Sequence, residues 1–496
     1  MTGSSDNALF GGLFDRGAVS TGGAAWLQAM LDTEAALARA VERAGLAPAG
    51  SGAAVTAVAR ADSFDNEDLG RAAAATGNPV PALVRALSRL LPAQAAGPEQ
   101  AAGPEQAVHR GATSQDIIDT AAMLIADRVL GSVLADLAAA ASHCADLARA
   151  HVASVLAGRT LLQQAVPVTF GLVAAGWLTA IDEARQDLHR VRTSRLAVQF
   201  GGAAGTLASL GAAGPAVLTL LAEELGLPAP VLPWHTNRVR IIQLGSALTV
   251  ACAALGKIAR DITLLAQTEV AEVHEHSGDG QRGGSSAMPH KQNPVAAVVI
   301  LGCAKRAPGL LATLAAAAEQ EHQRAAGGWH AEWETLSDLL RLTGSAAAWL
   351  ADLLGGLRVD TARMRANLDA SGGLPLAENL AMLLAPALGR LPAHDLVAKA
   401  SARAAAQGKG LADALMDALH ATVPGEGVPG GGVPGGGVPS QDTPGGESAA
   451  ARLHRAGIGR SQIDSALSPE AYLGACAEFV RRALTAHAGC DAELNG

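Results

Sequence analysis

The stretch Gly283-Gly284-Ser285-Ser286-Ala287-Met288-Pro289-His290-Lys291-Gln292-Asn293-Pro294 decides how the rest of the chain is interpreted. Its two glycines and two prolines predict a loop, because glycine permits unusual backbone angles and proline fixes φ and lacks an N–H donor. The stretch also carries two hydroxyls, an imidazole, an ammonium and amide groups. Loops on a rigid scaffold often carry function. We therefore expect a functional loop, with a plain polar turn between helices as the alternative on composition alone.

The bulk composition predicts a large, mostly helical protein. The chain has 496 residues, which is too many for one hydrophobic core and indicates two or three domains. Hydrophobic residues make up 49% and aromatic residues only 3%. Alanine dominates the hydrophobic part, and this favours closely packed helices over sheets.

Charge and cysteine usage narrow the choice of partners and compartment. The formal net charge is -9 and no basic run is present, which argues against nucleic acid and anionic membranes as partners. The five cysteines are scattered without metal-site spacing, so we expect a reduced, zinc-free protein. No signal segment is seen, and apolar runs such as 295–303 are far shorter than the roughly 18 residues of a membrane span. The expectation is a soluble, cytoplasmic protein.

Long helical patterns separated by glycine-bearing turns predict a helical bundle. They cover 25–46, 117–157, 168–198, 241–275 and the residues from 295 onward. Because these patterns are apolar over much of their circumference, we also expect a homo-oligomer. The duplicated Ala-Ala-Gly-Pro-Glu-Gln at 95–100 and 101–106 is interpreted as an exposed loop insertion.

After about Leu357 the predicted helices shorten, which indicates another domain. The Gly/Pro repeat at 423–446 is expected to form a flexible surface loop, because it can support neither a helix nor a packed core. We predict an N-terminal helical domain over 1–112, a central helical-bundle domain over 113–357 and a C-terminal helical domain over 358–496.

Four further stretches combine polar groups in unusual ways. In 109–116, Thr113 and Asp116 have the spacing of a capping box, and the same helix N-terminus is equally able to bind a carboxylate. The second stretch, 158–167, is irregular and lies between two helices, and the third, 199–206, is a glycine cluster that is a weak phosphate-binding signal. The fourth is the polar segment 234–238, which ends at Arg238, with the later stretches 321–324 and 329–333. Lone histidines in such stretches are more often structural.

Taken together, these segments resemble the fumarase/aspartase superfamily. Gly284 to Asn293 matches every fixed position of its signature, G-S-x-x-M-x-x-K-x-N. The Thr-Ser-Gln-Asp stretch at 113–116 and the Gly-Arg-Thr stretch at 158–160 match the other two segments of the superfamily in the same order. The resemblance implies an all-α fold of three domains with a central long-helix bundle. It also implies a homotetramer whose active sites gather the three segments from different subunits.

Two departures favour one branch of the superfamily. Fumarase-type and adenylosuccinate-type lyases have a histidine after Gly-Arg-Thr and a glutamate seven residues after the signature lysine, whereas this chain has Leu161 and Val298. In this it is similar to bacterial 3-carboxy-cis,cis-muconate cycloisomerases. That resemblance implies lactonisation to 4-carboxymuconolactone in protocatechuate breakdown through β-ketoadipate. An adenylosuccinate lyase-like enzyme and a non-catalytic structural relative remain the alternatives.

The resemblance also implies roles for individual residues. Ser285 would move the proton, and Lys291 with Asn293 would hold the carboxylate that becomes an enediolate. The residues expected to bind the remainder of a small tricarboxylate substrate are His109, Thr113, Ser114, Thr160, Gln163, Arg238, Arg282, Ser286, Met288 and His290. The implied reaction requires no metal and no organic cofactor.

Overall fold

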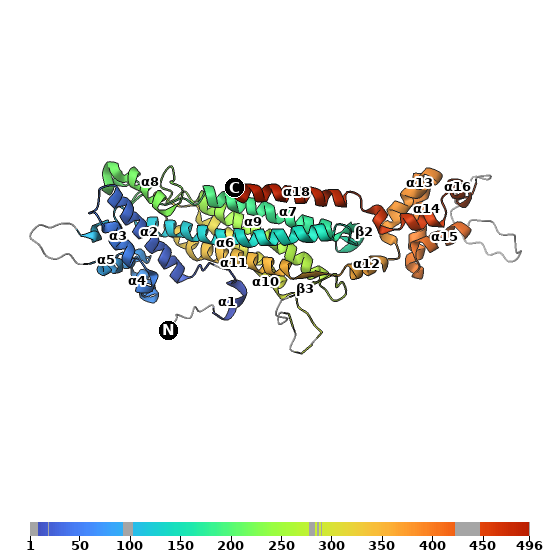
Figure 1. The fold of residues 1–496 in the computed structure, drawn as a ribbon, viewed down its shortest axis with the longest axis horizontal. Helices are drawn as coiled ribbons and strands as arrows, with labels where there is room; N and C mark the ends of the chain where they lie inside the picture. Colours follow the sequence, from blue (N-terminus) through green and yellow to red (C-terminus); the bar gives the residue numbers. More distant parts are fainter. Residues whose placement is uncertain are drawn as a thin grey trace, which may run out of the picture.

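The computed structural model describes residues 8–17, 19–92, 103–276, 283–284, 287–288, 290–421 and 447–495. The described chain is elongated, with a long central bundle flanked by a group of helices at each end (Figure 1). The predicted all-α fold is confirmed, apart from two small two-stranded sheets.

Five long helices form the central bundle. They are α6 (Ser114–Ala150), α7 (Phe170–Ser194), α9 (Val239–Leu265), α10 (Val295–Ala317) and α11 (Gly328–Gly355). Contacts between helix ends show that α6, α9 and α11 start at the same end of the bundle, where α7 and α10 finish. The sequence pattern predicted each of these helices, although it extended three of them too far at the C-terminal end.

Short helices cover the end of the bundle at which α6 begins. They are α2 (Gly23–Arg43), α3 (Ser51–Val58), η1 (Ala61–Ser63), α4 (Asn66–Thr76), α5 (Val80–Leu90) and η2 (Pro104–Ala107), joined by η3 (Ala208–Ala213) and α8 (Gly214–Leu225). The helix α1 (Ala8–Phe14) instead packs along the side of the bundle, against α10 and α11. The α2 helix packs on both α6 and α8. Its buried face continues the core of the bundle, since Leu27, Leu31 and Leu37 are almost fully buried.

The opposite end carries a group of helices with a core of its own. Its elements are α12 (Thr361–Asp369), η4 (Leu374–Leu376), α13 (Ala377–Leu388), α14 (Arg390–Gln407), α15 (Leu411–Ala421), α16 (Ala449–Arg455), α17 (Arg460–Ala466) and η5 (Pro469–Tyr472). Leu380, Leu384 and Leu415 lie in this separate core. The last helix, α18 (Cys476–Asn495), instead returns along α7 of the central bundle (Figure 1). The domain boundaries at 112 and 357 stay predictions.

The stretch 158–167 forms a β-hairpin, so the expected irregular connection is wrong. Strand β1 (Val155–Thr160) pairs with β2 (Gln163–Thr169) in antiparallel register. Leu161 and Leu162 form the two-residue turn with φ of 51° and 65°. A second short pair joins β3 (Val273–Glu275) to β4 (Leu357–Val359). These strands close the end of the bundle opposite the start of α6.

Two bundle helices, α9 and α10, are long and apolar enough to cross a membrane by length and composition. Both pack against α11 within the bundle, and α9 is the more buried of the two. Of the apolar window, 56% is buried in α9, as in a core helix of a soluble protein, and 33% is buried in α10. The predicted loop at 95–106 is described only from Gly103, and there η2 (Pro104–Ala107) takes up its last residues. The predicted loop at 423–446 lies outside the described residues.

Candidate active site

The described part of the signature loop is closed at its neck by Asn293. The backbone N–H and the side-chain Nδ2 of Asn293 both donate to the carbonyl oxygen of Gly283, each at 2.9 Å. Gly283 has φ of +85°, and a Cβ there would lie 2.5 Å from the Asn293 carbonyl oxygen. Only glycine therefore fits this position without a shift. In this chain Asn293 fixes the loop geometry, while Ser285, Ser286 and Arg282 lie outside the described residues.

The remaining predicted residues of the loop are exposed. Met288, His290 and Lys291 all lie at the surface of the single chain, and the Lys291 N–H donates to the Met288 carbonyl oxygen at 2.9 Å. Val298, one turn into α10, is 56% exposed. In the single chain, the Lys291 ammonium and the Val298 side chain therefore both face solvent.

The hairpin presents its predicted residues at an exposed tip. Thr160 and Gln163 form the last pair before the turn, and Leu161 is 98% exposed. Beside this pair lies Arg159, whose two terminal nitrogens donate to both carboxylate oxygens of Glu272 at 2.9 and 2.7 Å. Glu272 is fully buried, and bidentate pairs of this kind are geometrically specific. Arg159 therefore anchors the hairpin to the segment leading into β3.

The strand β3 also links the hairpin to the signature loop. Glu272 directly precedes β3 and binds Arg159, while Glu275 at its end accepts the N–H of Ala296 in the first turn of α10. A carboxylate is favourable at a helix N-terminus because it offsets the unpaired N–H groups there. The second and third predicted segments therefore lie at the same end of the bundle.

The first predicted segment lies at the other end. Thr113 is the N-cap residue of α6, and the hairpin follows soon after its C-terminal end. A helix of 37 residues is about 55 Å long. A single chain consequently does not bring Thr113 and Ser114 together with Thr160 and Gln163.

Around the start of α6 the structure builds a dense buried polar network. Asp116 accepts hydrogen bonds from the N–H groups of Thr113, Gly201 and Gly202, at 3.0, 3.0 and 2.9 Å. It also contacts His235 Nε2 at 2.7 Å and is almost fully buried. The glycine cluster at 199–206 thus serves as a cradle for this carboxylate rather than for a phosphate.

Arg238 lies in the same network and is held by two carboxylates. Its guanidinium donates to Asp119 at 2.7 and 3.0 Å and pairs with Glu332 on the other side. Its side chain is 1% exposed. Burial raises the pKa of Glu332 although Arg238 opposes that effect. The geometry favours a structural role for Arg238, and its predicted contact with substrate stays untested.

His109, in contrast, keeps one side of its ring open. Its backbone N–H donates to Glu34 Oε2 at 2.9 Å, and its Nδ1 contacts Glu34 Oε1 at 2.7 Å. Burial lowers the pKa of His109, but the attraction of Glu34 outweighs it and the net pKa is raised above its ordinary value. The protonated form of His109, beside the start of α6, is thereby favoured.

Sequence reasoning missed several residues of this network. Arg324 donates to the Thr113 hydroxyl at 2.5 Å, and Glu34 and Glu332 hold the two predicted cations His109 and Arg238. A signal for Glu34 existed, because it occupies a position of α2 at helical spacing from Met30 and Leu31 on the buried face. Arg324 stood in a polar stretch that the sequence singled out, but nothing in the sequence linked it to Thr113.

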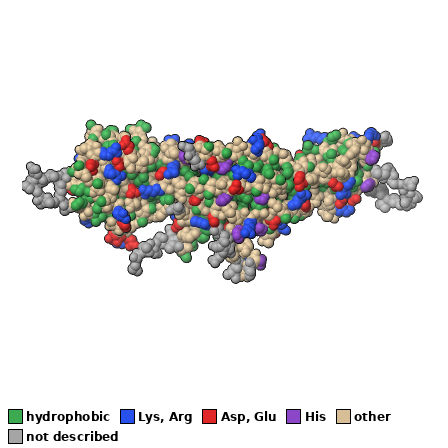
Figure 2. Space-filling model, viewed as in Figure 1, with side chains coloured by type: hydrophobic (Ala, Val, Ile, Leu, Met, Phe, Trp, Pro, Cys, Tyr) green, Lys and Arg blue, Asp and Glu red, His purple; other side chains and the backbone are tan. Residues whose placement is uncertain are grey.

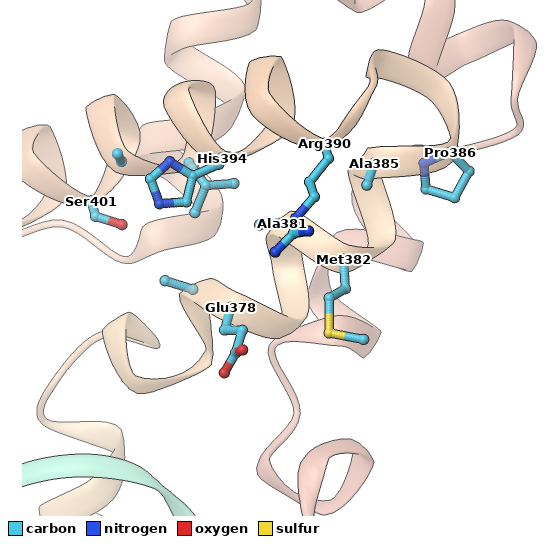
Figure 3. A pocket seen from close by; sticks show the side chains of 11 residues that line it. Glu378, Ala381, Met382, Ala385, Pro386, Arg390, His394 and Ser401 are labelled. Carbon is cyan, nitrogen blue, oxygen red and sulfur yellow. The ribbon is translucent and has the colours of Figure 1, made fainter.

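Two other features bear on where chemistry takes place. A cavity of about 920 Å³ lies between α13 and α14, where Figure 3 shows the side chains of Glu378, Arg390 and His394 around it. It contains none of the predicted site residues. Asp182, His487 and Asp491 could hold a metal ion by residue type, but the Arg185 guanidinium already pairs with both aspartates at 2.8 and 2.7 Å. That cluster joins α18 to α7.

The bundle connectivity, together with a Gly-Ser-x-x-Met-x-x-Lys-x-Asn loop that leads into a bundle helix, defines a lyase of the fumarase/aspartase class. A family model described as "Lyase" matches residues 20–309, which is more than half of the chain. The chain belongs to this lyase family.

Individual relatives agree with this class. The chain is 48% identical to a 3-carboxy-cis,cis-muconate cycloisomerase from Bradyrhizobium diazoefficiens, over 78% of this chain and 85% of the relative. It is 46% identical to a nitrosuccinate lyase from Streptomyces davaonensis, over 80% of this chain and 84% of the relative. The crystal structure of a 3-carboxy-cis,cis-muconate lactonizing enzyme from Pseudomonas putida superposes with a TM-score of 0.79 and 41% identity, covering 94% and 95% of the two chains.

Proposed function

We propose that this chain is a 3-carboxy-cis,cis-muconate cycloisomerase that forms 4-carboxymuconolactone in protocatechuate catabolism. The observation that carries the proposal is that a 48%-identical relative and a 41%-identical structural neighbour, covered over 85% and 95% of their lengths, bear this activity in their names. The substitution of Leu161 and Val298 for the histidine and glutamate of other lyases supports it. Because the nucleophile belongs to the substrate, no residue is needed to activate water.

In the proposed reaction a substrate carboxylate oxygen bonds to one carbon of a double bond, and a proton is added to the adjacent carbon. Charge builds up on the carboxylate next to that carbon as an enediolate, so fixed cations and hydrogen-bond donors should stabilise it. By its place in the signature, Ser285 supplies the proton, and Lys291 faces the enediolate. Asn293 closes the loop and, together with Lys291, holds the same carboxylate.

The other carboxylates of the substrate require further donors and cations. We propose that the hydroxyl and amide groups of the first and second segments bind them, namely those of Thr113, Ser114, Thr160 and Gln163. The cations that complete the pocket are His109, Arg238, Arg282 and His290. The signature loop adds Ser286 and Met288. Arg238 would reach a substrate only if its buried partners were rearranged.

A homotetramer with shared active sites is part of the proposal. Two observations support it: the segments lie at opposite ends of a 37-residue helix, and apolar residues such as Leu161 and Val298 are exposed in the single chain. A second copy placed alongside in the opposite direction would bring the two ends together. Acidic and basic side chains intermingle on the face in Figure 2, as expected of a soluble protein, and we propose a cytoplasmic location.

A second candidate follows from the 46%-identical nitrosuccinate lyase. Elimination from nitrosuccinate would remove a proton at carbon, expel nitrite and leave fumarate, with the same enediolate intermediate. The serine, lysine and cationic groups suit that reaction as well. Nitrite release from nitrosuccinate therefore has to be measured beside the first activity.

The deciding experiment follows the ultraviolet absorbance of the 3-carboxymuconate diene on addition of purified protein. Adenylosuccinate and nitrosuccinate serve as parallel substrates. Loss of the diene with formation of the lactone is the expected result. A protein that acts only on one of the parallel substrates would replace the proposal by the corresponding lyase, and a protein inactive on all three would favour a non-catalytic relative.

Substitution of Ser285 tests the chemical role of the loop. Ser285→Ala should lower kcat by about 10² to 10⁴, the range for a general acid–base group, without reducing the free energy of unfolding. Ala287→Ser, at an exposed position two residues on, is the matched control and should retain activity. Near-normal turnover by Ser285→Ala would remove Ser285 from proton transfer.

A further inference from the structure

Glu34 is a charged residue placed where an apolar residue would be expected. It lies in α2 among Met30, Leu31, Leu37 and Val41 and is fully buried. A carboxylate in such a place is costly unless its oxygens are paired. Here both oxygens are used, and both partners belong to His109.

His109 is held in an unusual backbone conformation by this pair. Its φ is 53°, in the left-handed region that residues other than glycine rarely adopt. Such conformations persist where the surroundings impose them, and they cluster at functional sites. One carboxylate oxygen fixes the backbone N–H and the other fixes ring Nδ1, so both the position and the orientation of the imidazole are set.

The other ring nitrogen of His109, Nε2, takes no part in the contact with Glu34. Among the described residues no hydrogen-bond partner of His109 Nε2 is found, and the side chain remains 22% exposed. The ring lies four residues before Thr113, where the first motif begins α6. A protonated ring would therefore offer Nε2–H, carrying positive charge, at the end of the bundle where this motif lies.

We propose that Glu34 is a positioning residue for the reaction: it holds His109 through Nδ1 so that Nε2–H binds one carboxylate of the substrate. This inference rests on the proposed function for the identity of the ligand. It gives Glu34 of α2 a part in binding a substrate carboxylate, a role that the sequence did not indicate for it.

The charged groups around His109 give the sign of the pH dependence. Glu34 of α2 and Asp116 of α6 both stabilise the imidazolium, whereas burial opposes it, and the net effect is a raised pKa. On the same end of the bundle, Arg324 binds the Thr113 hydroxyl, and η3 contributes the uncharged Leu210 beside Gly111. A group with a raised pKa is protonated below that pKa, so binding should be lost as the pH rises through it.

Glu34→Gln separates charge from shape. A glutamine can still accept the His109 N–H through its amide oxygen, and its NH₂ can donate to Nδ1 of a neutral ring. The variant thus keeps both contacts while removing the negative charge. Glu34→Asp keeps the charge with a shorter side chain. Glu42→Gln is the matched control on the same helix, because Glu42 binds only the backbone N–H groups of Gly50 and Gly52.

The first measurement is the titration of His109 in the free full-length protein by ¹³C-histidine NMR. His109→Asn identifies the signal, since asparagine tolerates a left-handed φ. We expect a pKa above the ordinary 6.5 in the unsubstituted protein, and a fall of about one unit or more in Glu34→Gln, with no change in Glu42→Gln. A pKa at or below 6.5, or an equal pKa in Glu34→Gln, would overturn the inference. If Glu34→Gln does not fold, the titrations of the unsubstituted protein and of Glu34→Asp decide.

The second measurement is the pH profile of kcat/KM with 3-carboxymuconate. In Glu34→Gln the loss of activity on the alkaline side should move to lower pH, with KM rising more than kcat falls. At a pH above both pKa values, the loss in kcat/KM should be roughly tenfold for one pKa unit. An unchanged profile in an active variant would sink the inference. Inactive unsubstituted protein would instead count against the proposed function, while the NMR titration still tests the pair.

Discussion

At the scale of single residues, Arg238 is the clearest case of a side chain whose partners decide its role. It compensates Asp119 and Glu332, and all three are buried. Removing one member of such a group leaves uncompensated charge, which typically costs about 3 to 5 kcal/mol. Arg238→Met should therefore lower the free energy of unfolding by that amount in denaturant titration.

Arg240 provides the matched control for this prediction. Arg240 follows Arg238 by two residues. Its guanidinium lies over the Trp234 ring, 4.9 Å from the ring centroid, and donates to the Arg195 carbonyl oxygen at 2.8 Å. No carboxylate depends on it in the described chain, so Arg240→Met should cost about 1 kcal/mol or less. Equal losses of unfolding free energy in the two variants would show that the buried ion pairs of Arg238 contribute no more to stability than the contacts of Arg240.

The same residues show what a sequence can predict at this scale. The signature loop and the Thr113 segment were recognisable because their residue types and spacing are local. Arg238 was recognised as polar and cationic, but its partners come from α6 and α11, which are 119 and 94 residues away. Whether a cation faces a ligand or a buried carboxylate depends on such distant contacts, so the sequence alone did not decide it.

At the scale of elements, the hairpin of β1 and β2 is the feature that sequence reasoning did not predict. In a sequence, a two-residue hairpin turn is usually recognised by Asn-Gly or Asp-Gly, because both turn residues need positive φ. Here the turn is Leu161-Leu162, with φ of 51° and 65°. The strand pairing and the anchor from Arg159 to Glu272 impose this conformation on residues that do not favour it.

The strained turn leads to a prediction about stability and activity. Replacing Leu161 by Asn and Leu162 by Gly should relieve backbone strain of about 1 kcal/mol or more per residue, so the melting temperature should not fall. If the apolar tip contributes to a neighbouring subunit's active site, kcat/KM should nevertheless drop at least tenfold. Thermal unfolding and the diene assay measure the two effects.

Ala271→Gly is the control for strain relief elsewhere, because Ala271 also has a positive φ, at 51°. It should gain stability without loss of activity. A hairpin variant that keeps full activity would show that Leu161 and Leu162 serve only as a turn.

At the scale of the whole molecule, the elongated bundle separates what the chemistry needs to combine. The start of α6 carries His109, Thr113 and Ser114, and the far end carries the hairpin and the signature loop. The sequence order of the three motifs predicted the family and hence the bundle. The distance between them follows only from the unbroken length of α6, and it makes self-association a requirement of the proposed site.

This requirement can be tested by mixing two inactive variants. Thr113→Val damages the first segment, and Lys291→Met damages the third. If each site takes these segments from different copies, a mixed oligomer contains some sites with neither defect. Co-refolding equal amounts should then restore roughly a quarter of the activity by random assortment in a closed tetramer. Mixing Lys291→Met with Ser285→Ala, both in one loop, should restore none, because every site then receives a damaged loop. Recovery in neither mixture, while the single variants form tetramers by light scattering, would place each complete site within one chain. Recovery in both mixtures would show that Lys291 and Ser285 of one loop do not serve the same site.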